Sequence, residues 1–397
     1  MKFESKTVHS GDRQKAGNYI PVTTPIYTAA SYIYDSMDQL DRVFAREEEG
    51  PSYARYDNPT TTALETLVNE LEGGHAAFAC SSGMMAMNIA LLAALVDRPK
   101  RVVAGNVLYG ATSLMLTTIF GALGIDTEFV DMCDLEAVEK AVTGEKTAAI
   151  VMETITNPLL RVPQLDKIAT IARKANAAVI VDNTFATPLL LRPMELGASM
   201  VIHSSTKYLA GHGDSLGGII VSDQAHFETL KTLYRTMGPN LGPFEAYLTM
   251  RGIKTLALRM ERQCENANKV ASWLKAHSRI SRVHFPGDPQ HPDAATVARL
   301  LPQGQAGAQS GAMVAFELKD AGKKEVFAFM EKLKMIVCAT SLGDVHTMVL
   351  YPAMASHRDL SPKHRERLGI GDNLVRLSVG IEAVDDILSD LESALRA

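Results

Sequence analysis

The sequence lacks clustered cysteines and a strong excess of charge of either sign. Its four cysteines are Cys80, Cys133, Cys264 and Cys338. They lie far apart and include no C-x-x-C pair, so we expect buried thiols of a reducing compartment, with neither disulfides nor a metal site. Forty basic residues against 45 acidic ones give a net charge of -5. Such a chain has no general attraction for nucleic acid.

Long hydrophobic runs are absent as well. The most apolar stretch, residues 86–96, contains Asn88 and is too short to span a bilayer, which takes ~20 apolar residues. The first residues, MKFESKTVHSGDRQKAG, are polar and cannot form the apolar part of a signal peptide. We therefore expect a soluble cytoplasmic protein with no membrane partner.

What the chain does have is enough apolar sequence for a large core. It contains 397 residues, of which 46% are hydrophobic and 21% charged. This composition excludes a disordered or collagen-like protein. At ~150 residues per domain, the length is that of roughly two or three domains.

Short apolar runs alternate with helical patterns over residues 61–250. The predicted strands are AAFA (76–79), RVVAG (101–105), TAAIVME (147–153), AVIVDNT (178–184), MVIHSS (200–205) and GGIIV (217–221). Helices are predicted from Thr62 to the glycines at 73–74, from about Met84, from about Ala111, and over 163–175. Apolar strands separated by helices predict a mostly parallel sheet with both faces buried, in an α/β fold. Ligands of such a sheet bind beyond the carboxyl ends of its strands.

The two ends of the chain follow other patterns. Residues 1–60 show little periodicity and many Pro, Thr, Tyr and Gly residues, so we expect an arm that lies across a partner surface. Residues 251–397 begin with a helical pattern over 252–276, followed at 286–311 by a stretch for which we expect surface loop with some helix. The strands AMVAFELK and LVRLSV, a helix around 323–334 and a last helix ending at Ala397 then predict a smaller α+β domain.

The segment HSSTKYLAGHGDSLGG (203–218) carries the clearest chemical signal. Lys207 stands just past a predicted strand and follows the hydroxyl residues Ser204, Ser205 and Thr206. Such a lysine is either a solvated loop residue or a Schiff-base nucleophile whose pKa is lowered by burial. Three adjacent hydroxyls suit a phosphate ester, and the glycines let the backbone approach a ligand closely.

Asp182 ends another predicted strand, in the run VIVDNT. It either caps the next helix or holds the ring nitrogen of pyridoxal phosphate in its protonated form, which makes the ring an electron sink. One strand-helix-strand unit separates Asp182 from Lys207. Both side chains can therefore reach one site.

Several further motifs occur in the same chain. They are Y-A-R-Y-D-N-P-T (53–60), S-S-G-M (81–84), L-Y-G (108–110), N-P (157–158), V-D-N-T (181–184), S-S-T-K-Y (204–208) and R-L-S-V-G-I-E (376–382). Together they closely resemble the Cys/Met-metabolism family of pyridoxal-phosphate enzymes, which includes methionine γ-lyase, cystathionine γ-synthase, cystathionine lyases and O-acylhomoserine sulfhydrylases. The resemblance covers nearly the whole chain. It implies the fold-type I, aminotransferase-like architecture and a homotetramer built from two catalytic dimers.

The resemblance also implies roles for single residues around the cofactor. Lys207 matches the Schiff-base lysine, which then acts as a mobile acid and base, and Asp182 matches the partner of the pyridine nitrogen. Tyr109 matches the tyrosine that stacks on the ring and helps to activate the amino group or the leaving group. Gly83 and Met84 match backbone amides at a helix start that bind the phosphate.

Other matched residues complete the implied site. Ser204 and Thr206 match hydroxyl donors to the phosphate, and Tyr53 and Arg55 match residues that reach the phosphate from the neighbouring subunit. The remaining matches are Asn157, a contact to the ring oxygen, Arg376, which clamps the substrate α-carboxylate, and Ser341 with Thr340 on the substrate side. His203 and His212 lack further metal-ligating neighbours, so we interpret both as structural.

Departures from the family pattern bear on the substrate. Cystathionine-handling members place Glu where this chain has Thr340, and many carry Arg at the position of Leu114. Both changes remove a charged handle, which disfavours cystathionine and O-succinylhomoserine. Methionine γ-lyases carry Cys at the position of Ala111, and a Lys-Asp pair in the segment that here reads LYRTMGPNLGPF (233–244). An apolar distal pocket nevertheless fits a thioether or a short O-acyl group.

The predicted function is a methionine γ-lyase-like γ-elimination that gives 2-oxobutanoate, ammonia and a thiol. The alternatives are γ-replacement, of the O-acetylhomoserine sulfhydrylase or cystathionine γ-synthase type, and a cystathionine γ-lyase. Two other classes are disfavoured. A nicotinamide oxidoreductase would need a G-x-G-x-x-G fingerprint after the first strand, and a non-catalytic scaffold would not need Lys207, Asp182 and Arg376 together.

Overall fold

The computed structural model describes residues 1–13, 18–304, 307–358 and 360–396. Its larger sheet has seven strands in the order β1-β7-β6-β5-β4-β2-β3. They are β1 Ala76–Cys80, β2 Arg101–Gly105, β3 Asp126–Val130, β4 Ala149–Glu153, β5 Ala178–Asp182, β6 Met200–His203 and β7 Gly218–Ser222. β7 runs antiparallel to its neighbours β1 and β6, whereas the other pairings are parallel. Parallel neighbours bring the carboxyl ends of β4, β5 and β6 to one edge.

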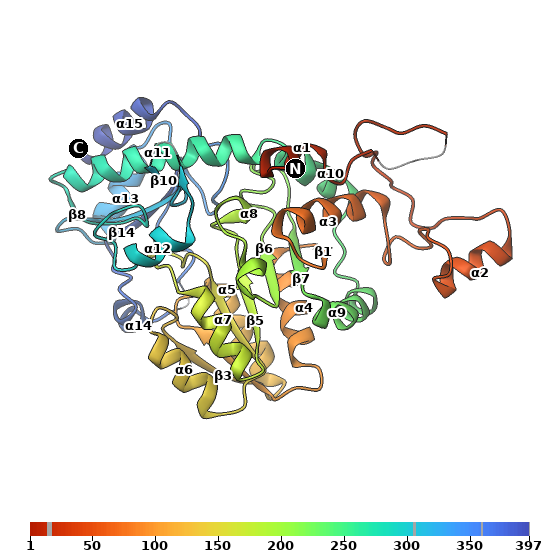
Figure 1. Ribbon diagram of the computed structural model, residues 1–397. Helices are drawn as coiled ribbons and strands as arrows, with labels where there is room; N and C mark the ends of the chain where they lie inside the picture. Colours follow the sequence, from red (N-terminus) through yellow and green to blue (C-terminus); the bar gives the residue numbers. More distant parts are fainter. Residues whose placement is uncertain (14–17, 305–306, 359, 397) are drawn as a thin grey trace.

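Helices cover both faces of this sheet (Figure 1). They are α3 Pro59–Glu72, α4 Gly83–Leu95, α5 Gly110–Met115 with a π-helical turn at Leu116–Phe120, α6 Leu135–Gly144, α7 Leu165–Lys174, α8 Thr187–Leu190, a 3-10 turn at Pro193–Leu196, α9 Gln224–Met237 and α10 Pro243–Ile253. Along β4, Ile150 and Met152 belong to one buried cluster, and Ala149 and Val151 to the other. Burial on both faces explains why these strands are apolar throughout.

Local signals set the ends of the site-bearing helices. Asn58 caps α3 through its side chain, Pro59 follows at the first helical position, and Gly73 ends the helix in a left-handed conformation (φ 77°). Ser82 caps α4 by accepting a hydrogen bond from the Met85 amide (3.1 Å). The start of α4 is thereby fixed next to the carboxyl end of β1.

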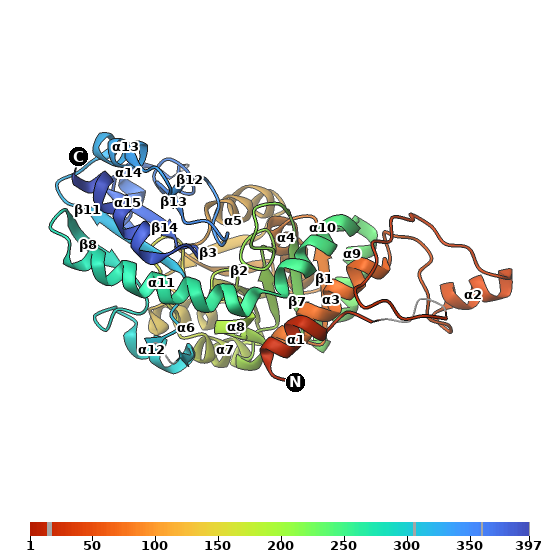
Figure 2. The same cartoon turned by 90° about the horizontal axis from the view of Figure 1, so that it is seen from above.

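A second sheet of five strands has the order β12-β13-β14-β11-β8. Its strands are β8 Ile280–His284, β11 Met313–Leu318, β12 Val337–Cys338, β13 Met348–Leu350 and β14 Leu374–Ser378. The accompanying elements are α11 Leu256–Ala276, α12 Ala294–Leu300, β9 Gln303–Gly304, β10 Gly307–Ala308, α13 Lys323–Lys332, α14 Pro362–Arg367 and α15 Val384–Arg396. α11 lies beside α15 and reaches from this sheet towards α1 (Figures 1 and 2). Phe316 and Leu377 from the sheet share a core with Leu391 of α15.

The structure differs from the predicted elements in several places. β3 is a strand at the edge of the sheet, and because its residues are partly exposed it lacks the apolar run that marks the others. The helical pattern over 252–276 belongs to the end of α10 and to α11. α6, α9 and most of α10 were not predicted, whereas α12 is a short helix inside the region 286–311, where loop with some helix was expected. Residues 305–306 of that loop and Ala397 lie outside the described residues.

The amino-terminal arm contains two helices that the sequence did not predict, α1 Phe3–His9 and α2 Met37–Ala45. α1 packs on α3 and α11 of its own chain with Phe3 buried, and Asp12 forms an ion pair with Lys254. By contrast, α2 stands away from both sheets in both views (Figures 1 and 2). Within the described ranges, no helix is both long and apolar enough to cross a membrane.

Candidate active site

A cavity of about 460 Å³ opens where β4, β5 and β6 end, the edge at which α/β sheets bind ligands. The start of α4 forms one part of its wall, and Arg376 on β14 of the second sheet forms another. The predicted site residues that line it are Gly83, Met84, Tyr109, Asn157, Asp182, Ser204, Thr206, Lys207, Thr340 and Arg376. The tertiary structure therefore collects residues that span most of the sequence.

Lys207 lies just past β6, as its sequence position predicts. Its Nζ donates a hydrogen bond to Ser341 Oγ (2.9 Å), so Ser341 also belongs to the site although it does not line the cavity itself. Burial, with a smaller effect from the positive charge of Arg376, lowers the pKa of Lys207. A lysine with a lowered pKa is neutral, and therefore nucleophilic and basic, nearer physiological pH.

Asp182 is the last residue of β5 and faces the same cavity. Its Oδ1 accepts a hydrogen bond from the Thr184 amide (2.9 Å), and burial raises its pKa, while hydrogen bonds to Thr184 and the nearby His203 oppose the rise. Among the described residues, no cation forms an ion pair with it. A positively charged N–H group in the cavity would stabilise this carboxylate.

The first turn of α4 approaches Ser204 closely. A Cβ atom at Gly83 would lie 3.0 Å from Ser204 Cβ, so only glycine fits there without displacement. The amides of Gly83 and Met84 belong to this first turn, where a helix leaves its N–H groups unpaired and favours an anion. Thr206 Oγ1 accepts a hydrogen bond from the Gly217 amide (3.0 Å) and lines the same part of the cavity.

Arg376 is 3% exposed and extends from β14 towards the cavity. Its Nη1 donates to Asn157 Oδ1 (2.8 Å) and its Nη2 to the Ser341 carbonyl (3.4 Å), whereas Nε is buried without a partner among the described residues. Burial lowers its pKa to about 10, which leaves the guanidinium charged at neutral pH. A buried cation with a free donor is suited to bind a carboxylate.

Tyr109 stands at the start of α5 and is 43% exposed, with its side chain on the cavity. Its amide donates to Glu153 Oε1 (2.6 Å). Glu153, the last residue of β4, lines the cavity but was not predicted as a site residue. The signal was available, since an acidic residue ends this apolar strand just as Asp182 ends the next one.

Tyr53 and Arg55 do not line the cavity of their own chain. The Arg55 guanidinium donates to the Arg235 carbonyl and to the Tyr56 hydroxyl (3.2 Å), and it lies over the rings of Tyr53 and Tyr56. Tyr53 is 44% exposed. A contribution of these two residues to a site would have to be made in a neighbouring subunit.

The two histidines near the lysine make structural contacts. His203 is buried, and its Nε2 lies 2.6 Å from Glu72 Oε1. The Nδ1 of His212 lies 2.7 Å from the Ala210 carbonyl oxygen. No group of His, Cys, Asp and Glu residues that could hold a metal occurs in the described part of the chain, and all four cysteines are free thiols.

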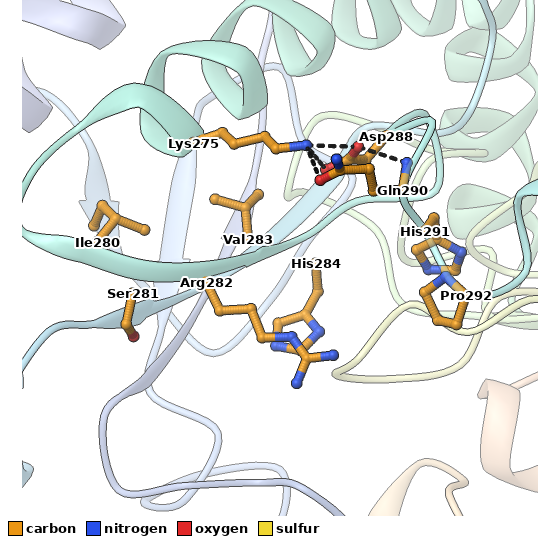
Figure 3. A pocket seen from close by; sticks show the side chains of 10 residues that line it. All are labelled: Lys275, Ile280, Ser281, Arg282, Val283, His284, Asp288, Gln290, His291 and Pro292. Atoms are coloured by element: carbon orange, nitrogen blue, oxygen red, sulfur yellow. Dashed lines mark hydrogen bonds and ion pairs between the residues drawn. The ribbon is translucent and has the colours of Figure 1, made fainter.

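A second cavity, of about 370 Å³, lies beside β8 and the end of α11 (Figure 3). Of its ionisable groups, Lys275, Asp288 and His284 are paired, whereas Arg282 forms no ion pair with a described residue. Lys275 Nζ donates to Asp288 Oδ2 (2.8 Å) and Gln290 Oε1 (3.0 Å), and His284 Nε2 lies 2.8 Å from Glu317 Oε1. Because these groups satisfy each other, they do not form a second set of convergent catalytic side chains.

The cavity at the sheet edge has the groups that pyridoxal phosphate needs. Asp182 offers a buried carboxylate that forms no ion pair with a described residue, which suits a protonated ring nitrogen. The first turn of α4 with Ser204 and Thr206 offers amides and hydroxyls for a phosphate, held at a distance that only Gly83 permits. Lys207 supplies a partly desolvated amine. These residues fit the cofactor.

Comparison with known proteins agrees with this geometry. The model of the family described as Cys/Met metabolism PLP-dependent enzyme matches residues 4–396. The chain belongs to this family. It is 41% identical to an L-methionine gamma-lyase from Pseudomonas putida over 402 residues, which cover 100% of this chain and 97% of that relative.

Two further relatives are similar along their whole length. A cystathionine gamma-lyase from Bacillus subtilis is 40% identical over 398 residues, with 100% of this chain and 99% of that relative covered. The crystal structure of cystathionine gamma-lyase from Lactobacillus plantarum, complexed with L-serine, superposes with a TM-score of 0.91 at 36% identity, covering 100% of this chain and 99% of the other.

Membership of the family confirms the predictions of fold class, cofactor and enzyme class. The protein is a fold-type I, pyridoxal-phosphate-dependent enzyme with a large mixed sheet, mostly parallel, and a smaller second sheet. It is a lyase of the trans-sulfuration type that belongs to sulfur amino acid metabolism. The alternatives of a nicotinamide oxidoreductase and a non-catalytic scaffold are not supported.

Proposed function

We propose that the protein catalyses γ-elimination from an amino acid with an uncharged thioether side chain, such as L-methionine. The products are 2-oxobutanoate, ammonia and a thiol. The observation that carries this proposal is the distribution of charge in the cavity. Its ionisable side chains are Glu153, Asp182, Lys207 and Arg376, and the proposal assigns them to the cofactor and to the substrate α-carboxylate.

The rest of the cavity wall is uncharged. Thr340 lines it at the position where cystathionine-handling relatives carry Glu, and Leu216, Leu350 and Ala355 add apolar surface. A distal ammonium or carboxylate would find no partner there, and burying an unpaired charge is costly. Ala111 and Leu114 do not line the cavity, and Leu114 is 48% exposed, so Thr340 carries this part of the argument.

Arg376 binds the substrate, and Lys207 transfers its protons. Arg376 lines the cavity and holds the α-carboxylate with its guanidinium. Pyridoxal phosphate, when bound, supplies an electron sink for the electron pair left at the α-carbon. Lys207 Nζ, with its lowered pKa, takes the α-proton, would give it up to the Schiff-base carbon that the cofactor contributes, and, neutral again, takes a proton from the β-carbon.

Tyr109 and Ser341 assist these proton transfers. The Tyr109 hydroxyl, on the cavity side of α5, gives a proton to the departing sulfur, so that a neutral thiol leaves. Ser341 Oγ accepts a hydrogen bond from Lys207 Nζ at 2.9 Å and holds the amine over the cavity between steps. Hydrolysis of what remains gives 2-oxobutanoate and ammonia.

The working assembly is proposed to be a homotetramer of two catalytic dimers in the cytoplasm. In support, Tyr53 and Arg55 lie outside their own cavity, and apolar residues of the arm are exposed, with Ile33 98% accessible. Four free thiols suit a reducing compartment. We further propose that residues 1–60 act as the intersubunit arm, 61–250 as the cofactor-binding domain and 251–397 as the C-terminal domain.

Release of 2-oxobutanoate from L-methionine alone tests the reaction. The purified, cofactor-loaded protein is expected to give steady-state release, with equal amounts of thiol and ammonia. L-Cystathionine at the same concentration is expected to give a lower kcat/KM, because Thr340 offers no charge to its distal amino group.

Two outcomes contradict the proposal. Absence of release from methionine, together with product from O-acetylhomoserine and sulfide, would identify a γ-replacement enzyme. A higher kcat/KM for cystathionine than for methionine would identify a cystathionine γ-lyase.

A further inference from the structure

Glu153 lies beside Asp182 and on the wall between the active-site cavity and a neighbouring one. It ends β4, and in the parallel pairing of β4 with β5 its register partner is Asp182. It is 7% exposed and lines the active-site cavity. It also lines a neighbouring cavity of about 310 Å³, so it forms part of the wall between the two.

Both carboxylate oxygens of Glu153 accept hydrogen bonds from the backbone of site residues. Oε1 accepts from the Tyr109 amide at 2.6 Å, and Oε2 accepts from the Asn157 amide at 2.9 Å. Tyr109 starts α5 without any capping hydrogen bond from its own side chain. The bond to Glu153 is therefore a main constraint on where this residue begins the helix.

Asn157, which Glu153 holds by its amide, in turn contacts Arg376. Asn157 Oδ1 accepts a hydrogen bond from Arg376 Nη1 at 2.8 Å. Asn157 and Arg376 are both buried, 3% exposed each. A shift of the Asn157 backbone would consequently move an acceptor of the guanidinium that binds the α-carboxylate.

The electrostatic environment of Glu153 favours a functional role for its side chain. Burial first, and then the neighbouring Asp182, raise the pKa of Glu153 to about 8, while the two amides and Arg376 oppose the rise. An apolar or amide side chain would avoid the cost of burying this carboxyl group. The two accepted N–H bonds are what a carboxylate provides and a glutamine does not, since glutamine has a single acceptor oxygen.

We infer that Glu153 is a positioning residue, which holds Tyr109 and Asn157, and through Asn157 also Arg376, in the arrangement that the reaction requires. The inference rests on the proposed function, because that function assigns the roles of Tyr109 and Arg376. The reacting groups remain Lys207 and Tyr109.

Glu153→Gln is the informative variant, because it keeps the volume and one acceptor oxygen. Its NH₂ group would face one of the two amide donors, so one hydrogen bond is lost. We expect the dissociation constant for pyridoxal phosphate and the KM for the amino acid each to rise about 10- to 100-fold, the range for a hydrogen bond to a charged group. The near-visible circular dichroism of the bound cofactor should shrink or shift, because it reports how the ring is held.

Asp390→Asn is the matched control. Asp390 is also a buried carboxylate that accepts backbone hydrogen bonds, from the amides of Lys334, Met335 and Ile336 at 2.8–2.9 Å. None of these residues lines the active-site cavity. This variant should lower the thermal midpoint while leaving the cofactor spectrum, the cofactor dissociation constant and the KM at the values of the parent protein.

The outcomes separate this inference from the proposed function. If Glu153→Gln loses only thermal stability, as the control does, Glu153 is a structural residue and the inference is wrong. If the parent protein does not release 2-oxobutanoate from methionine, the proposed function fails. The cofactor dissociation constant and the dichroism of Glu153→Gln still test the inference in that case.

Discussion

At the scale of single residues, burial acts in opposite directions on the two kinds of ionisable group in the cavity. It lowers the pKa of Lys207 and raises the pKa of Asp182 and Glu153. Each shift favours the neutral form. The amine is thereby prepared as a base, and the carboxyl group of Asp182 is left in need of a cationic partner, the role that a protonated ring nitrogen fills.

Lys207→Ala should abolish turnover and leave the fold intact. The variant removes the amine that carries both proton transfers, so we expect kcat to fall at least about a thousandfold, within the range for lost acid-base catalysis. The thermal midpoint should not fall, because burial of the Lys207 amine costs free energy in the folded state and alanine avoids that cost. Steady-state 2-oxobutanoate release and thermal unfolding measure the two effects.

Lys167→Ala serves as the control for this variant. Lys167 is exposed on α7 and does not line the cavity that Lys207 lines. Its removal should leave kcat unchanged. Turnover by Lys207→Ala at the rate of the parent protein would refute the role assigned to Lys207.

Residue types and motifs predicted most of the site. Lys207 and Asp182 stand at strand ends in apolar surroundings, and both line the cavity. Glu153 was overlooked because a single acidic residue after an apolar strand is compatible with a surface loop. Only the register between β4 and β5 places it beside Asp182.

At the scale of elements, helix starts and strand ends position the functional groups. The capped start of α4 brings the Gly83 and Met84 amides to the cavity, and the ends of β4 and β5 bring two carboxyl groups. α3 supports this region, since it packs on β1 and α10. Its amino end also ties the arm to the body.

Asn58→Ala should destabilise α3. Asn58 Oδ1 accepts hydrogen bonds from the Thr60 (2.9 Å) and Thr61 (3.4 Å) amides, and Nδ2 donates to the Tyr27 carbonyl (2.8 Å). Loss of such a cap costs about 1–2 kcal/mol. The midpoint of urea unfolding, at fixed protein and cofactor concentrations, should fall accordingly.

Asn58→Asp separates the two contacts of this side chain. Aspartate keeps the acceptor for the helix and loses the donor to Tyr27. The expected result is a smaller loss of stability than for alanine. An equal loss in both variants would mean that the tie to the arm, and not the helix cap, is what stabilises the protein.

The sequence patterns predicted the apolar, buried elements and missed those that are less apolar or short. The six strands predicted over residues 61–250 occur as β1, β2, β4, β5, β6 and β7, and the two predicted after residue 250 occur as β11 and β14. β3 was missed because an edge strand is covered on fewer sides and needs fewer apolar residues. α1 and α2 were missed because they are short, and α1 is held by packing on α3 and α11.

At the scale of the whole molecule, the active site joins two sheets. Asp182 and Lys207 belong to the larger sheet, whereas Arg376 comes from β14 of the second. The arm extends in the opposite direction, with α2 away from both sheets (Figure 2). Tyr53 is exposed on this arm, whereas Arg55 is held by the Arg235 carbonyl and the Tyr56 hydroxyl of its own chain, so a contact of Arg55 with a second copy would have to replace these bonds.

Arg55→Ala should weaken cofactor retention without changing the chemistry. If Arg55 reaches the phosphate in the neighbouring subunit, its loss removes charge-assisted hydrogen bonds, and the dissociation constant for pyridoxal phosphate should rise about 10- to 100-fold. Equilibrium dialysis or fluorescence titration of the cofactor-free protein measures this constant. Turnover at saturating cofactor should change less.

Arg42→Ala is the corresponding control. Arg42 is an exposed arginine of the same arm, on α2, and pairs with Glu48 at 3.0 Å. Exposed ion pairs contribute little to stability, so this variant should retain the cofactor like the parent protein. An unchanged dissociation constant in Arg55→Ala would remove Arg55 from the proposed shared site.

The sequence by itself determined the fold class and the cofactor, and it predicts which lysine reacts, because each depends on local patterns. Apolar runs form buried strands, hydroxyls beside a lysine at a strand end form a phosphate and amine site, and joint motifs identify the family. Only the tertiary structure decided which residues meet across the cavity. Strand register places Glu153 beside Asp182, and the packing of the second sheet brings Arg376 to Asn157 and Ser341. These contacts join residues far apart in the chain, and their geometry depends on how whole elements pack.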